Sequence, residues 1–189
     1  MSINYHERLL EVLNSNKDAI NISIEKLVRV VSEVAVSNNH VWLIGNGGSA
    51  STVEHFEVDL SFVKNDHMRS FSKISALTSN SALITATAND IDFSHLFSLI
   101  LQRKAQKNDL LIALSASGNS ENIINCVKKA NQMGLKTFSV IGFNGGKLKG
   151  LANDEIIVSS NIGEYEVVED IHLSIFHAVK MKLIEMHIN

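Results

Sequence analysis

The chain has 189 residues, a formal net charge of −3 and 45% hydrophobic residues. This length is enough for one domain with a sizeable hydrophobic core. The slightly acidic chain has no basic stripe, and no apolar run approaches the length of a membrane span, so we expect neither nucleic acid nor a membrane as a partner. The only cysteine, Cys126, excludes an intrachain disulfide. Because residues 1–8 also show no signal-peptide pattern, we expect a cytoplasmic protein.

Two helices are predicted ahead of the first strand, over residues 5–13 and 19–36, with a break at residues 14–18. Both carry apolar residues at near-helical spacing. The apolar faces of this N-terminal helical pair, residues 1–38, exceed what a small sheet needs. We therefore expect the pair to be used in oligomerisation; the alternative is that it simply caps the domain.

From residue 39 onward, short apolar runs alternate with amphipathic segments. The runs predict strands over residues 41–44, 72–77, 109–114, 136–141 and 155–158. The other segments predict helices over residues 50–64, 80–88, 93–106, 120–133 and 167–187, and a short helix that ends at Leu151. This alternation is typical of a parallel sheet with helices on both faces. We predict a single doubly wound α/β domain over residues 1–189, with a five-stranded parallel sheet, an α/β core at 39–189 and two extra N-terminal helices.

A hydroxyl-rich turn follows the strand at residues 109–114 and leads directly into a helix. It reads Ser115-Ala116-Ser117-Gly118-Asn119-Ser120. Free backbone N–H groups and the positive end of the helix dipole favour an anion here, and serine hydroxyls donate to phosphate oxygens without adding charge. The glycine lets the backbone approach a ligand closely. The turn therefore predicts a phosphate cradle; the alternative is that Ser120 or Asn119 only caps the helix.

Two further loops with ligand chemistry are expected at the same edge of the sheet, because the carboxyl ends of parallel strands gather there. One reads Gly45-Asn46-Gly47-Gly48-Ser49, and the other contributes Asn89 and Asp90. The glycine loop lacks the third glycine of the dinucleotide fingerprint, since Ala50 stands there, and it lacks the Lys-Ser/Thr of a P-loop. The loops therefore disfavour a nucleotide and favour a small, phosphorylated, polyhydroxylated ligand.

Two imidazoles and two carboxylates form a credible set of ligands for a borderline metal ion. His55 and Asp59 are one turn apart on one helix face, and Glu169 and His177 share the last helix. Glu169 and His177 are eight residues apart, about 12 Å along a helix axis, so one metal contacts both only if their side chains lean together. Otherwise the two residues serve different sites, or the helix is irregular near its start. We therefore expect a site that includes residues from two subunits. The other histidines are assigned to the surface or the core: His6, His40, His67, His95, His172 and His187.

These motifs, with Gly145-Gly146 and a closing helix that carries Glu169, His172 and His177, resemble the sugar isomerase (SIS) domain, and most of all the phosphoheptose isomerases. The resemblance runs over almost the whole chain. It implies interconversion of sedoheptulose 7-phosphate and D-glycero-D-manno-heptose 7-phosphate, in heptose biosynthesis for lipopolysaccharide or capsule. It also implies a homotetramer with active sites at subunit contacts, and a zinc ion bound in each subunit by a His, a Glu, a Gln and a His.

The resemblance further implies a role for each residue at a matching position. Ser115, Ser117 and Ser120 are expected to hold the sugar phosphate. The rest of the implied substrate-binding set is Asn46, Gly47, Gly48, Ser49, Asn89, Asp90, Ala116 and Glu169. The metal set is His55, Asp59, Glu169 and His177.

Two positions depart from the family pattern. Asp59 stands where the family has a glutamate base, and Glu169 stands where it has a glutamine ligand. Asp59 is one methylene shorter, and roughly 1 Å of misplacement can cost about 100-fold in rate. Either the two changes compensate each other, with Glu169 sharing or taking the role of the base, or the substrate is a different sugar phosphate. Loss of activity is disfavoured, because all four positions keep metal-competent groups.

Aldose–ketose isomerisation needs a base that moves a proton between adjacent carbons through an enediol, and an acid or metal that stabilises the developing oxyanion. We assign the base to Asp59, with Glu169 as its substitute. His177 is assigned as general acid or metal ligand, and His55 completes the metal site. The alternative is a non-catalytic SIS protein that senses a sugar phosphate or associates with the replication initiator. The retained histidines and carboxylates count against that alternative.

Overall fold

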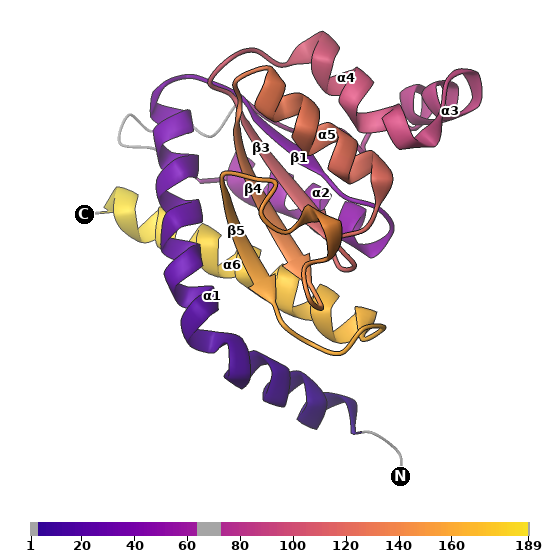
Figure 1. The fold of residues 1–189 in the computed structure, drawn as a ribbon. Coiled ribbons are helices and arrows are strands. Elements are labelled where there is room, and N and C mark those ends of the chain that lie inside the picture. Colours follow the sequence, from indigo (N-terminus) through magenta and orange to yellow (C-terminus); the bar gives the residue numbers. More distant parts are fainter. Residues whose placement is uncertain (1–3, 64–72, 189) are drawn as a thin grey trace.

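The computed structural model describes residues 4–63 and 73–188, with side chains up to residue 186. Lys64, His67 and Ser72 lie outside the described residues, as does the side chain of His187. Figure 1 shows a central sheet with helices on both of its faces. None of the described helices is long and apolar enough to cross a membrane.

Five parallel strands form the sheet, as predicted. They are β1 (Val41–Ile44), β2 (Ile74–Ala76), β3 (Leu110–Ser115), β4 (Lys136–Gly142) and β5 (Asp154–Val158), paired in the order β2-β1-β3-β4-β5. In register, Leu43 of β1 lies beside Ile112 of β3, which lies beside Phe138 of β4. Every residue of β3 is buried, which explains why this central strand is an uninterrupted apolar run up to Leu114.

The helices form one layer on each face of the sheet. They are α1 (Tyr5–Val36), α2 (Gly48–Ser61), α3 (Ser81–Asp90), α4 (Leu96–Lys104), α5 (Glu121–Gln132) and α6 (Tyr165–Ile188), with short 3₁₀ helices at Phe93–His95 and Gly146–Leu148. One core cluster, which includes Leu27, Phe56 and Phe176, joins α1, α2 and α6 to the sheet. A second, which includes Phe97 and Val127, joins α4 and α5 to the other face. α3 projects beyond this second layer (Figure 1).

The N-terminal segment is one continuous helix, so the prediction of two helices with a break at residues 14–18 is wrong. Asn16, within the expected break, is buried. Its amide donates to the Val12 carbonyl at 2.8 Å and to the Ser159 carbonyl at 2.9 Å, and its Oδ1 accepts from the Ser159 N–H at 2.8 Å. These bonds satisfy a buried polar side chain, so the helix continues through it. The partner is 143 residues away, beyond the reach of local sequence patterns.

β1 and β3 are neighbours at the centre of the sheet, but the chain leaves them toward opposite faces. α2 follows β1 and packs on one face, whereas α5 follows β3 and packs on the other. This is the topological switch point at which doubly wound sheets bind ligands. The loops at residues 45–47 and 116–120 meet there and line a common pocket.

Candidate active site

A pocket of about 250 Å³, called here the serine pocket, opens at the carboxyl ends of β1 and β3. It is lined by Asn46, Gly47, Gly48, Ser49, Leu114, Ser115, Ala116, Ser117, Ser120, Tyr165 and Glu169. Of the eleven predicted substrate-binding residues, all but Asn89 and Asp90 therefore lie together. Sequence reasoning missed Leu114 and Tyr165, because only the packing of α6 against the strand ends brings Tyr165 to the pocket.

The serine hydroxyls of the pocket are not used to cap α5. Ser120 stands at the N-cap position, but its side chain makes no capping hydrogen bond within the described part of the chain. Asn119 is also engaged elsewhere, since its Oδ1 accepts from the Lys147 N–H and its Nδ2 donates to the Ser117 carbonyl. The alternative in which these residues only cap the helix is therefore not supported. Ser120 instead lines the pocket, and the Ile123 N–H in the first turn of α5 donates to Asn122 Oδ1 at 3.0 Å.

Close backbone packing explains the glycine in the serine loop. Gly118 has φ +64°, a conformation that side chains disfavour, and a Cβ there would overlap the carbonyl of Gly145. Ser115 Oγ accepts from the Gly118 N–H at 3.1 Å, and Ser117 Oγ accepts from the Asn119 N–H at 3.2 Å. The loop is therefore fixed by its own bonds before any ligand arrives.

Two helix N-termini converge on the serine pocket. α2 begins at Gly48 and α5 begins at Glu121, and the N-terminal end of each helix carries partial positive charge. The two elements are tied together by Asn46 and Asn122, whose amides exchange reciprocal hydrogen bonds at 2.9 Å. Asn122 is buried, so this pair holds the glycine loop in register with α5. The pocket is thus suited to an anion such as a phosphoryl group.

Glu169 brings a carboxylate into this anion-favouring pocket. It extends from α6 against the backbone of Gly48, where an added Cβ would overlap its carboxylate. Burial raises the pKa of Glu169, and the neighbouring carboxylates of Glu166 and Asp170 raise it further. A carboxyl group with a raised pKa is able to exchange protons nearer neutral pH, as an acid–base catalyst must.

A second group of functional side chains lies where α2 packs against α6. We call His55 and Asp59 of α2, with His177 and Lys180 of α6, the α2–α6 cluster. Asp59 Oδ2 lies 3.6 Å from His55 Nε2 and 3.9 Å from His177 Nε2, and the two Nε2 atoms are 3.3 Å apart. The imidazoles are about half exposed, at 53% and 48%, whereas the Asp59 side chain is 9% exposed. The cluster is therefore open to solvent at its histidines and closed at its carboxylate.

Lys180 was missed by sequence reasoning. Its Nζ donates to Asp59 Oδ1 at 2.5 Å, so the carboxylate already has one cationic partner. The signal that indicates it is spacing, because Lys180 follows His177 by three residues and so shares its helix face. That spacing becomes informative only once α2 is known to pack against this face.

The α2–α6 cluster fits a divalent metal ion. Ligand atoms of His55, Asp59 and His177 all lie within 4.8 Å of one another. Asp59 Oδ2 is buried and has no hydrogen-bond partner among the described residues. Two imidazoles and one carboxylate match the three protein ligands of a catalytic zinc site. Glu169 does not belong to this group and lies at the serine pocket instead.

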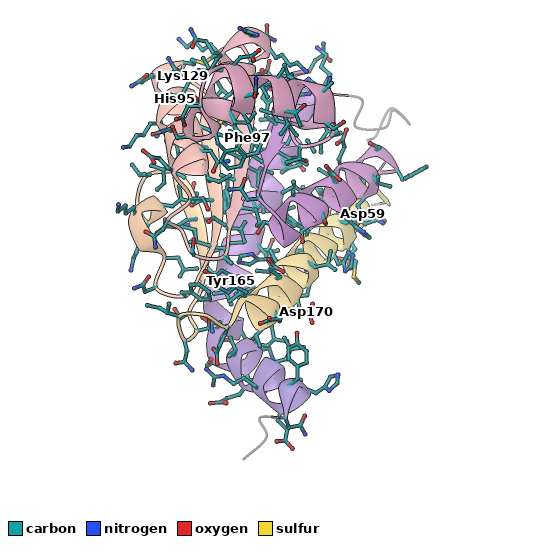
Figure 2. All side chains as sticks on the ribbon, turned by 90° about the vertical axis from the view of Figure 1, so that its right-hand side faces the viewer. Asp59, His95, Phe97, Lys129, Tyr165 and Asp170 are labelled. Carbon is teal, nitrogen blue, oxygen red and sulfur yellow. The ribbon has the colours of Figure 1, made fainter. Side chains whose placement is uncertain are left out.

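The serine pocket and the α2–α6 cluster lie toward opposite ends of the same helix pair. Figure 2 shows Tyr165 at the start of α6 and Asp59 further along, where α2 runs beside it. Asn89 and Asp90 lie at neither place. They are exposed at the end of α3, where the Asn89 amide donates to Asp90 at 2.8 Å. The structure of one chain therefore does not bring these two residues to the pocket.

His172 is a fully buried histidine on α6 between the two regions. Neither ring nitrogen has a partner within hydrogen-bond geometry among the described residues. Burial lowers the pKa of His172 to about 4, and the backbone of nearby Ile141 offsets only part of this effect. The ring is therefore neutral at physiological pH and belongs to the core. His6 and His95 lie at the surface.

Comparison with known proteins gives one consistent family. The SIS domain family matches residues 4–142. A probable phosphoheptose isomerase of Thermoplasma acidophilum is 32% identical over 163 residues, which cover 85% of this chain and 88% of that protein. A phosphoheptose isomerase of Helicobacter pylori is 33% identical over 180 residues, 92% of each chain. The solved structure of a phosphoheptose isomerase from Francisella tularensis superimposes with a TM-score of 0.85 at 25% identity, covering 96% of this chain and 95% of that one.

The doubly wound sheet with a serine-lined pocket at its switch point, together with this match, defines the class: the chain belongs to the SIS-domain family. Within that family it is of the phosphoheptose isomerase type, as the relatives from two organisms and the solved structure from a third agree.

Proposed function

We propose that this protein is a sugar-phosphate isomerase that interconverts sedoheptulose 7-phosphate and D-glycero-D-manno-heptose 7-phosphate. Relatives named phosphoheptose isomerase, which align with almost the whole chain, support a phosphorylated sugar as substrate. The observation that carries the proposal is the arrangement of Asp59, whose buried Oδ2 has no partner among the described residues and faces two imidazoles. An unsatisfied buried carboxylate oxygen is costly, and sites of this kind are retained for chemistry.

The phosphoryl group of the substrate binds in the serine pocket. Ser115, Ser117 and Ser120 supply hydroxyls, and the N-termini of α2 and α5 supply backbone N–H groups and partial positive charge. The preformed loop pays little ordering entropy on binding. This end of the substrate is held, and the reacting carbons lie beyond it.

The proton transfer is assigned to the α2–α6 cluster. Asp59 removes a proton from the hydroxyl-bearing carbon next to the carbonyl group, and the two carbons form the enediol. Asp59 then returns the proton to the former carbonyl carbon. His177 donates a proton to the carbonyl oxygen as negative charge develops there, and it regains a proton from the adjacent hydroxyl when that oxygen becomes the new carbonyl. His55, within 3.3 Å of His177, keeps that ring oriented. Each step leaves the sugar with its original number of electrons, as an isomerisation requires.

Glu169 is the second candidate for the base. It lies in the serine pocket and has a raised pKa, so it is chemically competent. It is eight residues from His177, about 12 Å along the helix, and it therefore cannot act on the same carbon as His177 within one chain unless the substrate spans both regions. Replacing Glu169 and Asp59 singly separates the two assignments, because only the true base abolishes turnover when it is removed.

The zinc ion that the family resemblance implies would be held by His55, Asp59 and His177, whose ligand atoms are already gathered. When bound it would polarise a sugar oxygen as a Lewis acid.

A homotetramer with active sites at subunit contacts is part of the proposal. It is supported by exposed apolar side chains on the outer side of α1, among them Leu10, Ile22 and Val36, which a second subunit would cover. It is also supported by the open histidines of the α2–α6 cluster and by the exposed position of Asn89 and Asp90. In the tetramer, Asn89 and Asp90 of one subunit would lie at the serine pocket of a neighbouring subunit, because they do not reach the pocket of their own chain. Mass measurement by light scattering tests the tetramer.

Incubation with sedoheptulose 7-phosphate, followed by NMR with and without zinc, tests the function. Appearance of heptose 7-phosphate signals supports the isomerase. Line broadening without turnover supports a sugar-phosphate sensor. If neither turnover nor line broadening is seen, the result supports the remaining alternative, a scaffold that associates with the replication initiator. Another sugar phosphate that turns over faster would keep the reaction class and change the substrate.

A further inference from the structure

The two oxygens of Asp59 have different surroundings. Oδ1 accepts from Lys180 Nζ at 2.5 Å. Oδ2 is buried, lies 3.6 Å from His55 Nε2 and 3.9 Å from His177 Nε2, and has no hydrogen-bond partner among the described residues. One oxygen is therefore held by a cation that belongs to the protein, and the other is free to bind a ligand.

The charge of Lys180 bears directly on cation binding. With neutral imidazoles, Asp59 and Lys180 cancel each other, so a divalent cation bound at Oδ2 leaves a local charge of +2. Without the ammonium group, Asp59 would offset half of the charge of the same cation. Because Asp59 is almost buried, solvent screens this repulsion only in part, although the Lys180 side chain is 32% exposed. Lys180 therefore opposes any second cation at this carboxylate.

We propose that Lys180 is a positioning residue that occupies Asp59 as a fixed cation and weakens the binding of divalent metal by the α2–α6 cluster. Asp59 is the assigned base, so the proposal rests on the proposed function for its consequence: the carboxylate keeps a cationic partner even when no metal is bound. The metal affinity of the cluster is then set by Lys180 as well as by its three ligands.

A purely structural role for Lys180 has the opposite consequence. If the ammonium group only held the carboxylate in place, its removal would leave Asp59 looser and metal would bind more weakly. The sign of the change in zinc affinity therefore separates the two roles. Asp59→Asn serves as the reference, because the part of the zinc affinity that it removes is the part that depends on this carboxylate, while His55 and His177 remain.

The experiment is a zinc titration by calorimetry, without any sugar, on the wild type, Lys180→Met and Lys182→Met. Lys182 is the matched control, because it lies on the same helix and pairs with Glu25 at 2.5 Å. We expect Lys180→Met to bind zinc about tenfold more tightly, which corresponds to about 1.4 kcal/mol. Lys182→Met should stay within about twofold of the wild type.

Two further variants keep the outcome clear. Lys180→Arg keeps the charge and should bind zinc as the wild type does. Lys180→Gln removes the charge but keeps a hydrogen-bond donor, and it should show the same tightening if Lys180→Met fails to fold. Zinc binding that is unchanged or weaker in folded Lys180→Met or Lys180→Gln overturns the proposal. Since the titration needs no turnover, failure to isomerise heptose phosphate would overturn the proposed function and leave the role of Lys180 standing.

Discussion

The serine pocket and the α2–α6 cluster are built in different ways. The pocket is formed largely by backbone at the ends of two adjacent strands, and its loop is fixed by hydrogen bonds of its own. The cluster consists of four side chains on two helices, with histidines about half exposed. The fold itself therefore specifies the pocket proposed for an anion, whereas the chemistry proposed for the other end depends on individual side chains and on what covers them.

The largest effect is expected from a substitution in the α2–α6 cluster, at Asp59. Asp59→Asn removes the base but keeps the shape of the side chain, so kcat should fall about a thousandfold. KM should change little, because the phosphoryl group binds at the other region. Steady-state kinetics with sedoheptulose 7-phosphate measure both quantities. Glu54→Gln, the same kind of change on the same helix, is the control, and an equal loss of kcat there would contradict the assignment.

His172 tests the helix that carries both regions. Its pKa of about 4, against an ordinary value near 6.5, means that the unfolded chain binds more protons in that window, so the stability due to this group falls as the pH falls from about 6.5 to 4. At 1.36 kcal/mol per pKa unit the loss is about 3 kcal/mol. Urea unfolding measures the decrease in the free energy of unfolding between pH 7 and pH 4. We expect this decrease to be smaller in His172→Leu than in the wild type by about the same amount. An identical pH dependence of the two proteins would show that His172 is not the acid-sensitive group.

Gly48 tests the contact that joins α6 to the pocket. A Cβ at Gly48 would overlap the Glu169 carboxylate, which is the far end of a flexible side chain and can move aside, so Gly48→Ala should cost only about 1 kcal/mol of stability. In the background of Glu169→Ala the same change should cost almost nothing, because the clash is gone. A double-mutant cycle in denaturant unfolding measures this coupling. Additive effects of the two changes would place Glu169 elsewhere.

The change expected to leave both the fold and kcat nearest to the wild type is Ser120→Ala. Ser120→Ala removes one hydrogen bond to a charged phosphoryl group, worth about 1.5 kcal/mol, so the sugar phosphate should bind about tenfold more weakly. Here kcat should stay close to that of the wild type, the reverse of the pattern at Asp59. Calorimetric titration with the sugar phosphate measures the affinity. Ser51→Ala, on an exposed part of α2, is the control, and equal weakening there would argue against a specific serine cradle.

How far the sequence predicts the structure also differs between the two regions. The serine pocket follows from local signals, since the apolar run of β3, the serines after it and the helix at Glu121 are contiguous in the chain. The cluster needs the packing of α2 against α6, which joins residues 121 positions apart at Lys180 and Asp59, and no local pattern specifies that. The continuity of α1 escaped prediction for the same reason, because the buried Asn16 side chain bonds to the distant Ser159 as well as to Val12 of its own helix.

At Glu169 the role that the family pattern implies differs from the position of the side chain in the structure. Its sequence position made it a candidate metal ligand, substrate contact and base at once, and the structure brings it to the pocket beside Gly48 and away from the gathered ligand atoms. Because Glu169 and His177 are eight residues apart on one helix, the sequence predicts their separation along the helix axis. It does not predict that the Glu169 side chain points toward the serine pocket. We accordingly propose a substrate-facing role for Glu169 rather than a place in the metal site.

The most direct measurement is the isomerisation of sedoheptulose 7-phosphate in D₂O, followed by NMR for the wild type and Asp59→Asn. An enediol formed by a side-chain base predicts product with deuterium on the carbon that receives the proton, at a rate that falls with Asp59→Asn while the sugar phosphate still binds. Turnover that Asp59→Asn leaves intact would contradict the account, as would a wild-type protein that binds the sugar phosphate and never exchanges its proton.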